Sequence, residues 1–232
     1  MKNSGEEAHR PKGPLCAVKN EAHRPKGPLC AARNLETLGS AAAGIAHDIN
    51  NQLHLIVNHL AVTDIDGAHR AAQRCSALTE NLLAFCRGNP VELIPLDPGD
   101  FLIDFVDQLE LPQGIDVRLN LAPALPAILA DPFSLSRALT NLISNACDAM
   151  NGDGVIRITA SPRAIIVADS GPGIAEDVIL RIFEPFFTTK GDDGTGLGLS
   201  IVRDLMYQQG GSVSVHSAPG EGAQFTLRFR AA

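Results

Sequence analysis

The feature that most constrains the fold is the alternation of strand-like and helix-like segments in the second half of the chain. Residues 131–150 carry apolar side chains at helical spacing, with Asp131 at the position of an N-cap and Pro132 just inside the helix. A second helical pattern covers residues 198–210. Segments typical of strands surround both helices, at 115–121, 154–160, 164–169, 212–217 and 223–229. This order predicts an α/β sandwich.

Two further helical patterns precede this region. Apolar residues recur at steps of three and four from Leu35 to Ile56, and the stretch DIDG at 64–67 ends that pattern. A second stripe runs from Ala71 to Phe85 and ends before RGNP. One hairpin cannot bury both apolar faces, so we expect two chains to pair as a homodimeric four-helix bundle.

The first 34 residues contain a tandem repeat, EAHRPKGPLCAVKN followed by EAHRPKGPLCAARN, with 12 of 14 positions identical. Each copy holds two prolines and a glycine and little apolar periodicity, which predicts a flexible leader. The expected organisation is therefore a leader at 1–34, a helical hairpin at 35–88, a connection at 89–112 that contains a helix and opens the second domain, and an α/β domain at 113–232.

Composition narrows the class of protein. The net charge of −7 argues against non-specific binding to nucleic acid. The sequence has no run of 18 apolar residues, and its start lacks the apolar core of a signal peptide. The five cysteines are scattered without a CxxC pair, which is typical of reduced thiols. We expect a soluble cytoplasmic protein that binds neither nucleic acid nor membrane.

Two polar motifs in the α/β region indicate a ligand site. In NLISNACDAM, Asn141 and Asn145 are four residues apart and so share one helix face. Amide oxygens suit a magnesium ion whose charge is already partly neutralised by phosphates. In DSGPGI, a strand delivers Asp169 to a pocket rim, and Gly171 and Gly173 let the backbone pass close to a planar ligand. A carboxylate there can accept a hydrogen bond from an exocyclic amino group such as that of adenine.

A third motif, FEPFFTTKGDDGTGLGLS at 183–200, carries several glycines and runs into the helix at 198. Backbone amides at such a junction favour phosphate oxygens, and the phenylalanines at 183, 186 and 187 are expected to anchor the loop. No GK[ST] follows, so the loop is not a P-loop, and no suitable strand precedes it as in a Rossmann fingerprint. Each of the three motifs also has a purely structural interpretation, and only their joint order and spacing is specific.

Together these motifs resemble the ATP-binding domain of sensor histidine kinases, within the GHKL ATPase superfamily. NLISNACDAM is similar to the asparagine box, DSGPGI to the first glycine box, FEPFFTTK to the phenylalanine box and GTGLGLS to the second glycine box, over roughly residues 113–230. The resemblance implies a Bergerat-type fold that binds ATP with Mg²⁺. The residues it assigns to nucleotide binding are Asn141, Asn145, Asp169, Gly171, Gly173, Lys190, Gly194, Thr195, Gly196, Leu197 and Gly198, with Asn145 as the magnesium ligand.

The resemblance also separates branches of this superfamily. Members that hydrolyse ATP carry a glutamate four residues before the magnesium-binding asparagine, and here Asn141 stands at that position. The chain therefore resembles the phosphotransferring branch, and its hairpin distinguishes it from anti-sigma-factor kinases. Asp148 stands where other kinase branches carry a basic residue, and the resemblance assigns it no role.

The hairpin carries the stretch GIAHDINN, whose apolar seam places His47 at the outermost heptad position, in water. This segment is similar to the AHDFNN-type phosphoacceptor helix of histidine kinases, and NLLAFCR resembles the end of their second helix; the resemblance covers roughly residues 33–88. A neutral imidazole can attack a phosphoryl group, and Asp48 can orient the ring and take its proton. By resemblance, Asn51 positions a water for dephosphorylation of a response regulator. His54 shares the heptad position one repeat later but lacks a following acid.

The sequence thus predicts an α+β protein, a histidine kinase core that phosphorylates His47 from Mg-ATP and passes the phosphoryl group to an aspartate of a response regulator acting in trans. No sensor or receiver domain is expected within these residues. Two alternatives remain at this point. One is a degenerate phosphotransfer or binding module without ATP turnover, and the other is mainly a response-regulator phosphatase dependent on Asn51.

Overall fold

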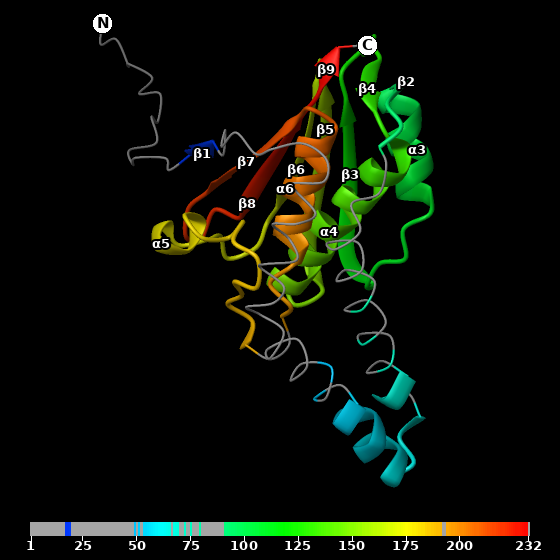
Figure 1. The fold of residues 1–232 in the computed structure, drawn as a ribbon, viewed down its shortest axis with the longest axis vertical. Coiled ribbons are helices and arrows are strands. Elements are labelled where there is room, and N and C mark those ends of the chain that lie inside the picture. Colours follow the sequence, from blue (N-terminus) through cyan, green and yellow to red (C-terminus); the bar gives the residue numbers. More distant parts are fainter. Residues whose placement is uncertain are drawn as a thin grey trace, which may run out of the picture.

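The computed structural model describes residues 17–19, 49, 51, 53–65, 67–69, 72, 75, 79, 91–191 and 194–231. His47 and Asp48 lie outside the described residues, so their predicted roles stay predictions. Within the described part, residues 17–19 and 91–231 form a mixed sheet in the order β1-β7-β8-β6-β5-β3 and a separate small sheet in the order β2-β4-β9 (Figure 1).

Apart from β1, the strands of the large sheet follow the predicted segments closely. In spatial order they are β1 (Ala17–Lys19), β7 (Ser212–Ser217), β8 (Ala223–Arg228), β6 (Ala164–Asp169), β5 (Asp153–Ser161) and β3 (Gly114–Leu121). Pairing of β3 with β5 is parallel, and the other neighbours are antiparallel. Buried and partly exposed residues alternate along β7, as expected of a strand with one face on the core.

Two strand groups were not expected from the sequence. The small sheet contains β2 (Ile94–Leu96), β4 (Ile128–Ala130) and β9 (Arg230–Ala231), which are too short to show an alternating pattern. β1 lies within the predicted flexible leader, and its three residues pair antiparallel with β7, Val18 opposite Val215.

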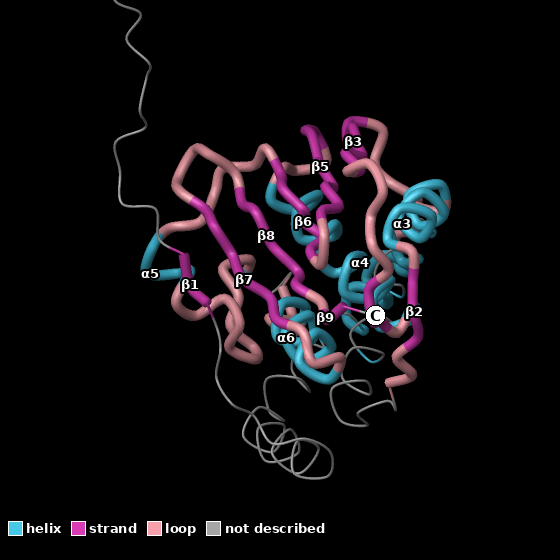
Figure 2. The backbone as a smooth tube through the Cα atoms, turned by 90° about the horizontal axis from the view of Figure 1, so that it is seen from above, coloured by secondary structure: helices cyan, strands magenta, loops and turns pink. Residues whose placement is uncertain are grey.

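The helices of this region are α3 (Pro98–Asp107), α4 (Pro132–Ala149), the short α5 (Glu176–Ile179) and α6 (Gly198–Gln208). α4 begins as predicted, because the Asp131 side chain accepts hydrogen bonds from the Phe133 N–H and the Ser134 hydroxyl. α4 and α6 contact each other and lie on the same face of the large sheet (Figure 2). The α/β sandwich is therefore confirmed.

The core lies between these two helices and the sheet. Many of its fully buried side chains come from α4, β5, β6, α6 and β8, including Leu135, Leu142, Ile158, Met206 and Leu227. Burial of side chains of this size is the main favourable contribution to folding. Because α4 and α6 are fixed by this core, the polar faces they direct away from it are held in place as well.

The described hairpin residues are helical at 49, 51 and 53–61 and again at 65, 67–69, 72, 75 and 79. Asp64 begins the second helical stretch, since its side chain accepts a hydrogen bond from the Gly67 N–H and its carbonyl accepts one from the Ala68 N–H. The Asp64 carboxylate also lies 2.8 Å from His59 Nδ1. The helical pattern is therefore interrupted at 62–64, slightly before the predicted position, and residues 65 and 67 of DIDG already belong to the second helical stretch.

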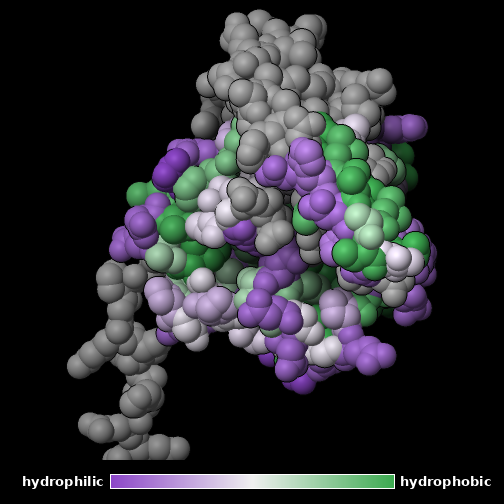
Figure 3. Space-filling model, turned by 90° about the horizontal axis from the view of Figure 1, so that it is seen from below, coloured by the Kyte–Doolittle hydropathy of each residue, from purple (hydrophilic) through white to green (hydrophobic). Residues whose placement is uncertain are grey.

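Several apolar side chains of the hairpin are exposed. They are Leu53, Leu55, Val57, Leu60, Val62 and Ile65. Figure 3, which views the molecule from the end where these residues lie, shows apolar surface exposed on this side. None of the described helices has the length and apolar character that crossing a bilayer requires.

Candidate functional site

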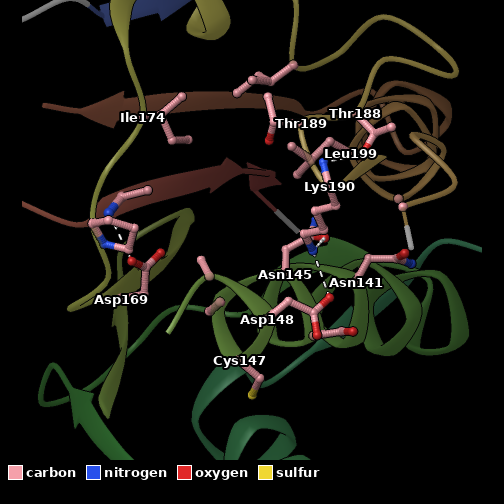
Figure 4. A pocket seen from close by; sticks show the side chains of 18 of the residues that line it. Asn141, Asn145, Cys147, Asp148, Asp169, Ile174, Thr188, Thr189, Lys190 and Leu199 are labelled. Atoms are coloured by element: carbon pink, nitrogen blue, oxygen red, sulfur yellow. Dashed lines mark hydrogen bonds and ion pairs between the residues drawn. The ribbon is translucent and has the colours of Figure 1, made fainter. Parts of the chain in front are cut away.

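A cavity of about 1000 Å³ opens between α4, the loop that follows β6, and the glycine-rich segment that leads into α6. Its volume is in the range of cavities that hold cofactor-sized ligands. One wall is apolar and includes Ile174, Val178, Ile182 and Phe225. The polar groups gather at two separate places, around Asp169 and around Asn145 (Figure 4).

The first polar group is the Asp169 carboxylate at the end of β6. Its Oδ1 accepts hydrogen bonds from the Gly171 N–H at 2.9 Å and from the Ala223 N–H at 3.2 Å. These bonds fix the carboxylate in one orientation on the cavity wall. Among the described residues no partner is recorded for Oδ2, so this oxygen can accept a hydrogen bond from a ligand amino group.

The turn after Asp169 requires glycine at 173. Gly173 has φ +74°, and a Cβ at this position would overlap the Ala218 carbonyl oxygen. Both the left-handed backbone and this close approach exclude a side chain. The turn is held further by a hydrogen bond from the Ile174 N–H to the Ser217 hydroxyl, at 2.9 Å. The Asp169 end of the cavity is therefore built from backbone groups with little freedom to move.

The second polar group lies on α4, where Asn141 and Asn145 share one face as predicted. The Asn141 amide donates to the Arg137 carbonyl at 2.9 Å, which leaves its Oδ1 directed toward the start of α6. A Cβ at Gly198 would lie 3.1 Å from Asn141 Oδ1 and 3.6 Å from Asn145 Nδ2. Glycine at this position thus allows the start of α6, with its unpaired backbone N–H groups, to approach the asparagine pair.

A backbone hydrogen bond joins the two ends of the glycine-rich segment, at Phe186 and Gly196. The Phe186 N–H donates to the Gly196 carbonyl at 2.9 Å, and both residues have positive φ, +66° and +62°. Phe183 is buried, and the Arg181 guanidinium lies 4.3 Å from the centroid of the half-buried Phe187 ring. The expected anchoring by phenylalanines is therefore present, with Phe186 acting through its backbone.

Lys190 extends from this segment to α4. Its Nζ lies 2.7 Å from Asp148 Oδ2 and 3.4 Å from Asn145 Oδ1, and its backbone N–H donates to Thr188 Oγ1 at 3.0 Å. Sequence reasoning assigned Asp148 no role. The contact of Asp148 with Lys190 joins residues that are 42 positions apart in the sequence. A role for Asp148 could have been predicted only by pairing this acid with that lysine.

The same contact bears on the predicted magnesium ligand. Asn145 Oδ1 already faces a cationic group, the Lys190 ammonium, at the polar end of the cavity. One amide oxygen does not hold Mg²⁺ by itself, but it suits an ion that also contacts ligand phosphates. No cluster of three or more His, Cys, Asp or Glu side chains suited to a metal occurs in the described part of the chain.

Cys147 lines the cavity, but its thiol is not suited to nucleophilic chemistry. Burial, followed by the nearby Asp148 charge, raises the pKa of the Cys147 thiol. A thiol with a raised pKa stays protonated near neutral pH and is a poor nucleophile. Figure 4 shows its sulfur directed away from Lys190 and Asn145.

The structure brings together most of the predicted nucleotide-binding residues. Those that line the cavity are Asn141, Asn145, Asp169, Gly173, Lys190, Gly194, Thr195, Gly196 and Gly198. Gly171 and Leu197 do not line it: the Gly171 N–H orients Asp169, and the Leu197 side chain is buried. Asn51 is half-buried on the helical stretch of the hairpin.

Residues 130–232 match the family described as histidine kinase-, DNA gyrase B-, and HSP90-like ATPase. This match covers α4, both glycine-rich motifs and the closing strands, so the region that builds the cavity is similar to this family of ATPases.

Curated relatives extend the similarity beyond this domain. The chain is 38% identical over 212 residues to sensor histidine kinase ZraS of Escherichia coli O157:H7, which covers 83% of this chain and 46% of the relative. It is 35% identical to sensor kinase CckA of Brucella abortus (strain 2308), covering 83% of this chain and 24% of the relative. The expected enzyme class, an ATP-dependent protein-histidine kinase, is thus the class of these relatives. The chain spans about half the length of ZraS.

Two solved structures are similar to the chain in fold. Full-length ShkA in complex with AMPPNP superposes with a TM-score of 0.62 at 27% identity, covering 85% of this chain and 47% of ShkA. Histidine kinase ThkA in complex with response regulator protein TrrA has a TM-score of 0.69 at 23% identity, covering 87% of this chain and 64% of that one. The second likeness is one of fold alone.

Proposed function

We propose that the protein is the core of a homodimeric histidine kinase that phosphorylates His47 from Mg-ATP and transfers the phosphoryl group to an aspartate of a separate response regulator. The observation that carries this proposal is the arrangement of one cavity with a fixed carboxylate at one end and an asparagine pair, a lysine and a helix start at the other. These two ends match the two chemically different ends of a nucleoside triphosphate.

The Asp169 end suits the base. Oδ1 is occupied by two backbone N–H groups, and Oδ2 is directed to a cavity whose adjacent wall is apolar. An adenine ring packed on Ile174, Val178 and Phe225 would donate its exocyclic amino group to this oxygen. The similarity to ShkA, whose structure contains the ATP analogue AMPPNP, supports adenine as the base.

The α4 and α6 end suits the phosphates. The Lys190 ammonium and the backbone N–H groups at the start of α6 would neutralise phosphate oxygens, and Asn145 Oδ1 would hold Mg²⁺ between them. When bound, the magnesium ion supplies charge neutralisation on the transferring phosphoryl group. Asn141 gives no general base for water, which favours transfer to a histidine over hydrolysis.

The proposed phosphoacceptor, His47, and its neighbour Asp48 are assigned from the sequence alone, because both lie outside the described residues. A ring nitrogen of neutral His47 attacks the γ-phosphorus, a P–N bond forms as the P–O bond to ADP breaks, and Asp48 takes the ring proton. Asn51, one helical turn after His47, is proposed to position the water that later dephosphorylates the regulator.

Homodimerisation is supported by the hairpin surface. Apolar side chains of the first helical stretch, such as Leu53, Val57 and Leu60, are exposed in the single chain. A second hairpin packed against this surface in a four-helix bundle would bury them. A regulator receiver domain would then approach the outer face that carries His47.

The proposal is tested by incubating the full chain with γ-labelled ATP and Mg²⁺, with His47→Gln and His54→Gln as matched variants. Acid-labile label should appear on the wild type and on His54→Gln and should be absent from His47→Gln. Label that persists in His47→Gln assigns the acceptor elsewhere. A wild type that binds ATP without becoming labelled contradicts autophosphorylation and leaves the binding or phosphatase alternatives.

A further inference from the structure

The ion pair between Lys190 and Asp148 connects two of the segments that line the cavity. Lys190 belongs to the glycine-rich segment, and Asp148 to the last turn of α4. Their side chains are 35% and 57% exposed, so water screens the pair and its strength is modest. The ion pair therefore adds little to stability, and its main effect is on the position of the Lys190 ammonium.

Asp148 holds the Lys190 ammonium against the predicted magnesium ligand. Nζ lies 2.7 Å from Asp148 Oδ2 and only 3.4 Å from Asn145 Oδ1 (Figure 4). A magnesium ion bound to that oxygen would lie close to the ammonium, and two cations at such separation repel each other. Bound magnesium would therefore disfavour this position of Lys190.

Resting on the function proposed above, we infer that Asp148 is a positioning residue that retains Lys190 at Asn145 in the nucleotide-free protein and releases it when Mg-nucleotide binds. Lys190 then exchanges the carboxylate of Asp148 for phosphate oxygens of the ligand. No covalent bond changes in this exchange. Because the Asp148 pair must be broken first, Asp148 lowers the affinity for Mg-nucleotide.

The exchange is tested by a double-mutant cycle on the affinity of the full chain for a fluorescent ATP analogue in the presence of Mg²⁺. The variants are Asp148→Asn, Lys190→Gln and the double variant. Asp116→Asn is the matched control, because Asp116 also forms an exposed 2.7 Å ion pair, with Arg118 on β3, and does not line the cavity. Its affinity should equal that of the wild type.

Asp148→Asn should bind the analogue about two- to fivefold more tightly than the wild type, the range that an exposed ion pair supports. In the Lys190→Gln background the same substitution should give at most half that gain. An equal gain in both backgrounds would mean simple repulsion between Asp148 and the phosphates, which overturns the inference. A loss of affinity on Asp148→Asn would mean that the pair serves the bound state, which also overturns it.

A second measurement does not require nucleotide. The rate at which an amine-reactive reagent acylates Lys190 is followed by mass spectrometry in the nucleotide-free chain. Asp148→Asn should raise this rate severalfold, and Asp116→Asn should not change it; equal rates in wild type and Asp148→Asn contradict the retention of Lys190. If wild type shows retention and yet binds no nucleotide, the proposed function fails and the exchange fails with it. If wild type binds nucleotide without coupling in the cycle, only the exchange fails.

Discussion

The two ends of the cavity are built by different means. At the Asp169 end, backbone N–H groups of Gly171 and Ala223 hold the carboxylate, and the surrounding turn is fixed by a glycine that admits no side chain. At the other end, the exposed side chains of Lys190 and Asp148 hold each other. Backbone groups in a packed turn define a geometry that a ligand must fit, whereas an exposed ion pair can exchange partners at small cost. The first end is suited to recognition and the second to exchange.

The largest effect that separates the two ends is expected at their glycines. Gly173→Ala places a Cβ against the Ala218 carbonyl oxygen, and φ is +74° there, so the free energy of unfolding should fall by about 2–4 kcal/mol. Gly191 also has positive φ, +57°, but a Cβ there meets nothing within 4 Å. Gly191→Ala should therefore cost only about 1 kcal/mol. Urea unfolding of both variants measures the difference, and equal losses would contradict a rigid Asp169 end.

Removal of the carboxylate should have the next largest effect. Asp169→Ala would leave two backbone N–H groups, and the adenine amino group that we propose binds there, without their acceptor, so affinity for ATP should fall by about 10- to 100-fold. Calorimetric titration of the full chain measures this loss. Affinity within twofold of the wild type would show that the base is not held at this end.

The Asn145→Ala variant should distinguish the contribution of magnesium to ATP affinity from that of the nucleotide itself. The variant loses the proposed metal ligand while the Asp169 contacts remain, so affinity for ATP should fall about tenfold with Mg²⁺ present and change little with a chelator present. Paired titrations in the two conditions test this expectation. An equal loss in both conditions would assign Asn145 to the nucleotide directly.

The smallest effect is expected when the ion pair between Lys190 and Asp148 is removed and the free energy of unfolding is measured. Because the Lys190 and Asp148 side chains are partly exposed, Asp148→Asn should change the free energy of unfolding by less than about 1 kcal/mol. Urea unfolding at low and high salt measures it, and the small effect should shrink further at high salt. A loss of several kcal/mol would make the pair a structural one and weaken the contrast between the two ends.

Local signals in the sequence were sufficient for most of this fold. Asp131 and Pro132 marked the start of α4, and short segments typical of strands marked β3 and β5 to β8, because capping and strand preference act between near neighbours. The small sheet of β2, β4 and β9 was not predicted, since strands of two or three residues carry no period. β1 was not predicted because its pairing depends on the edge of β7, which lies about 200 residues away in sequence, and not on its own composition.

The site was predictable to a similar degree. Motif spacing gave the asparagine pair, Asp169 and the glycines, which the structure gathers around one cavity. Leu197 stood inside the same glycine motif but turned its apolar side chain into the core. Asp148 was missed because its partner is contributed by a loop whose path the sequence does not define.

The most direct test of these two ends is a crystal structure of the full chain with Mg²⁺ and a non-hydrolysable ATP analogue. We predict the adenine amino group within hydrogen-bond distance of Asp169 Oδ2, Mg²⁺ on Asn145 Oδ1, and Lys190 on the phosphates and away from Asp148. A nucleotide bound in the opposite direction, or bound with no contact to Asp169, would contradict the proposed site.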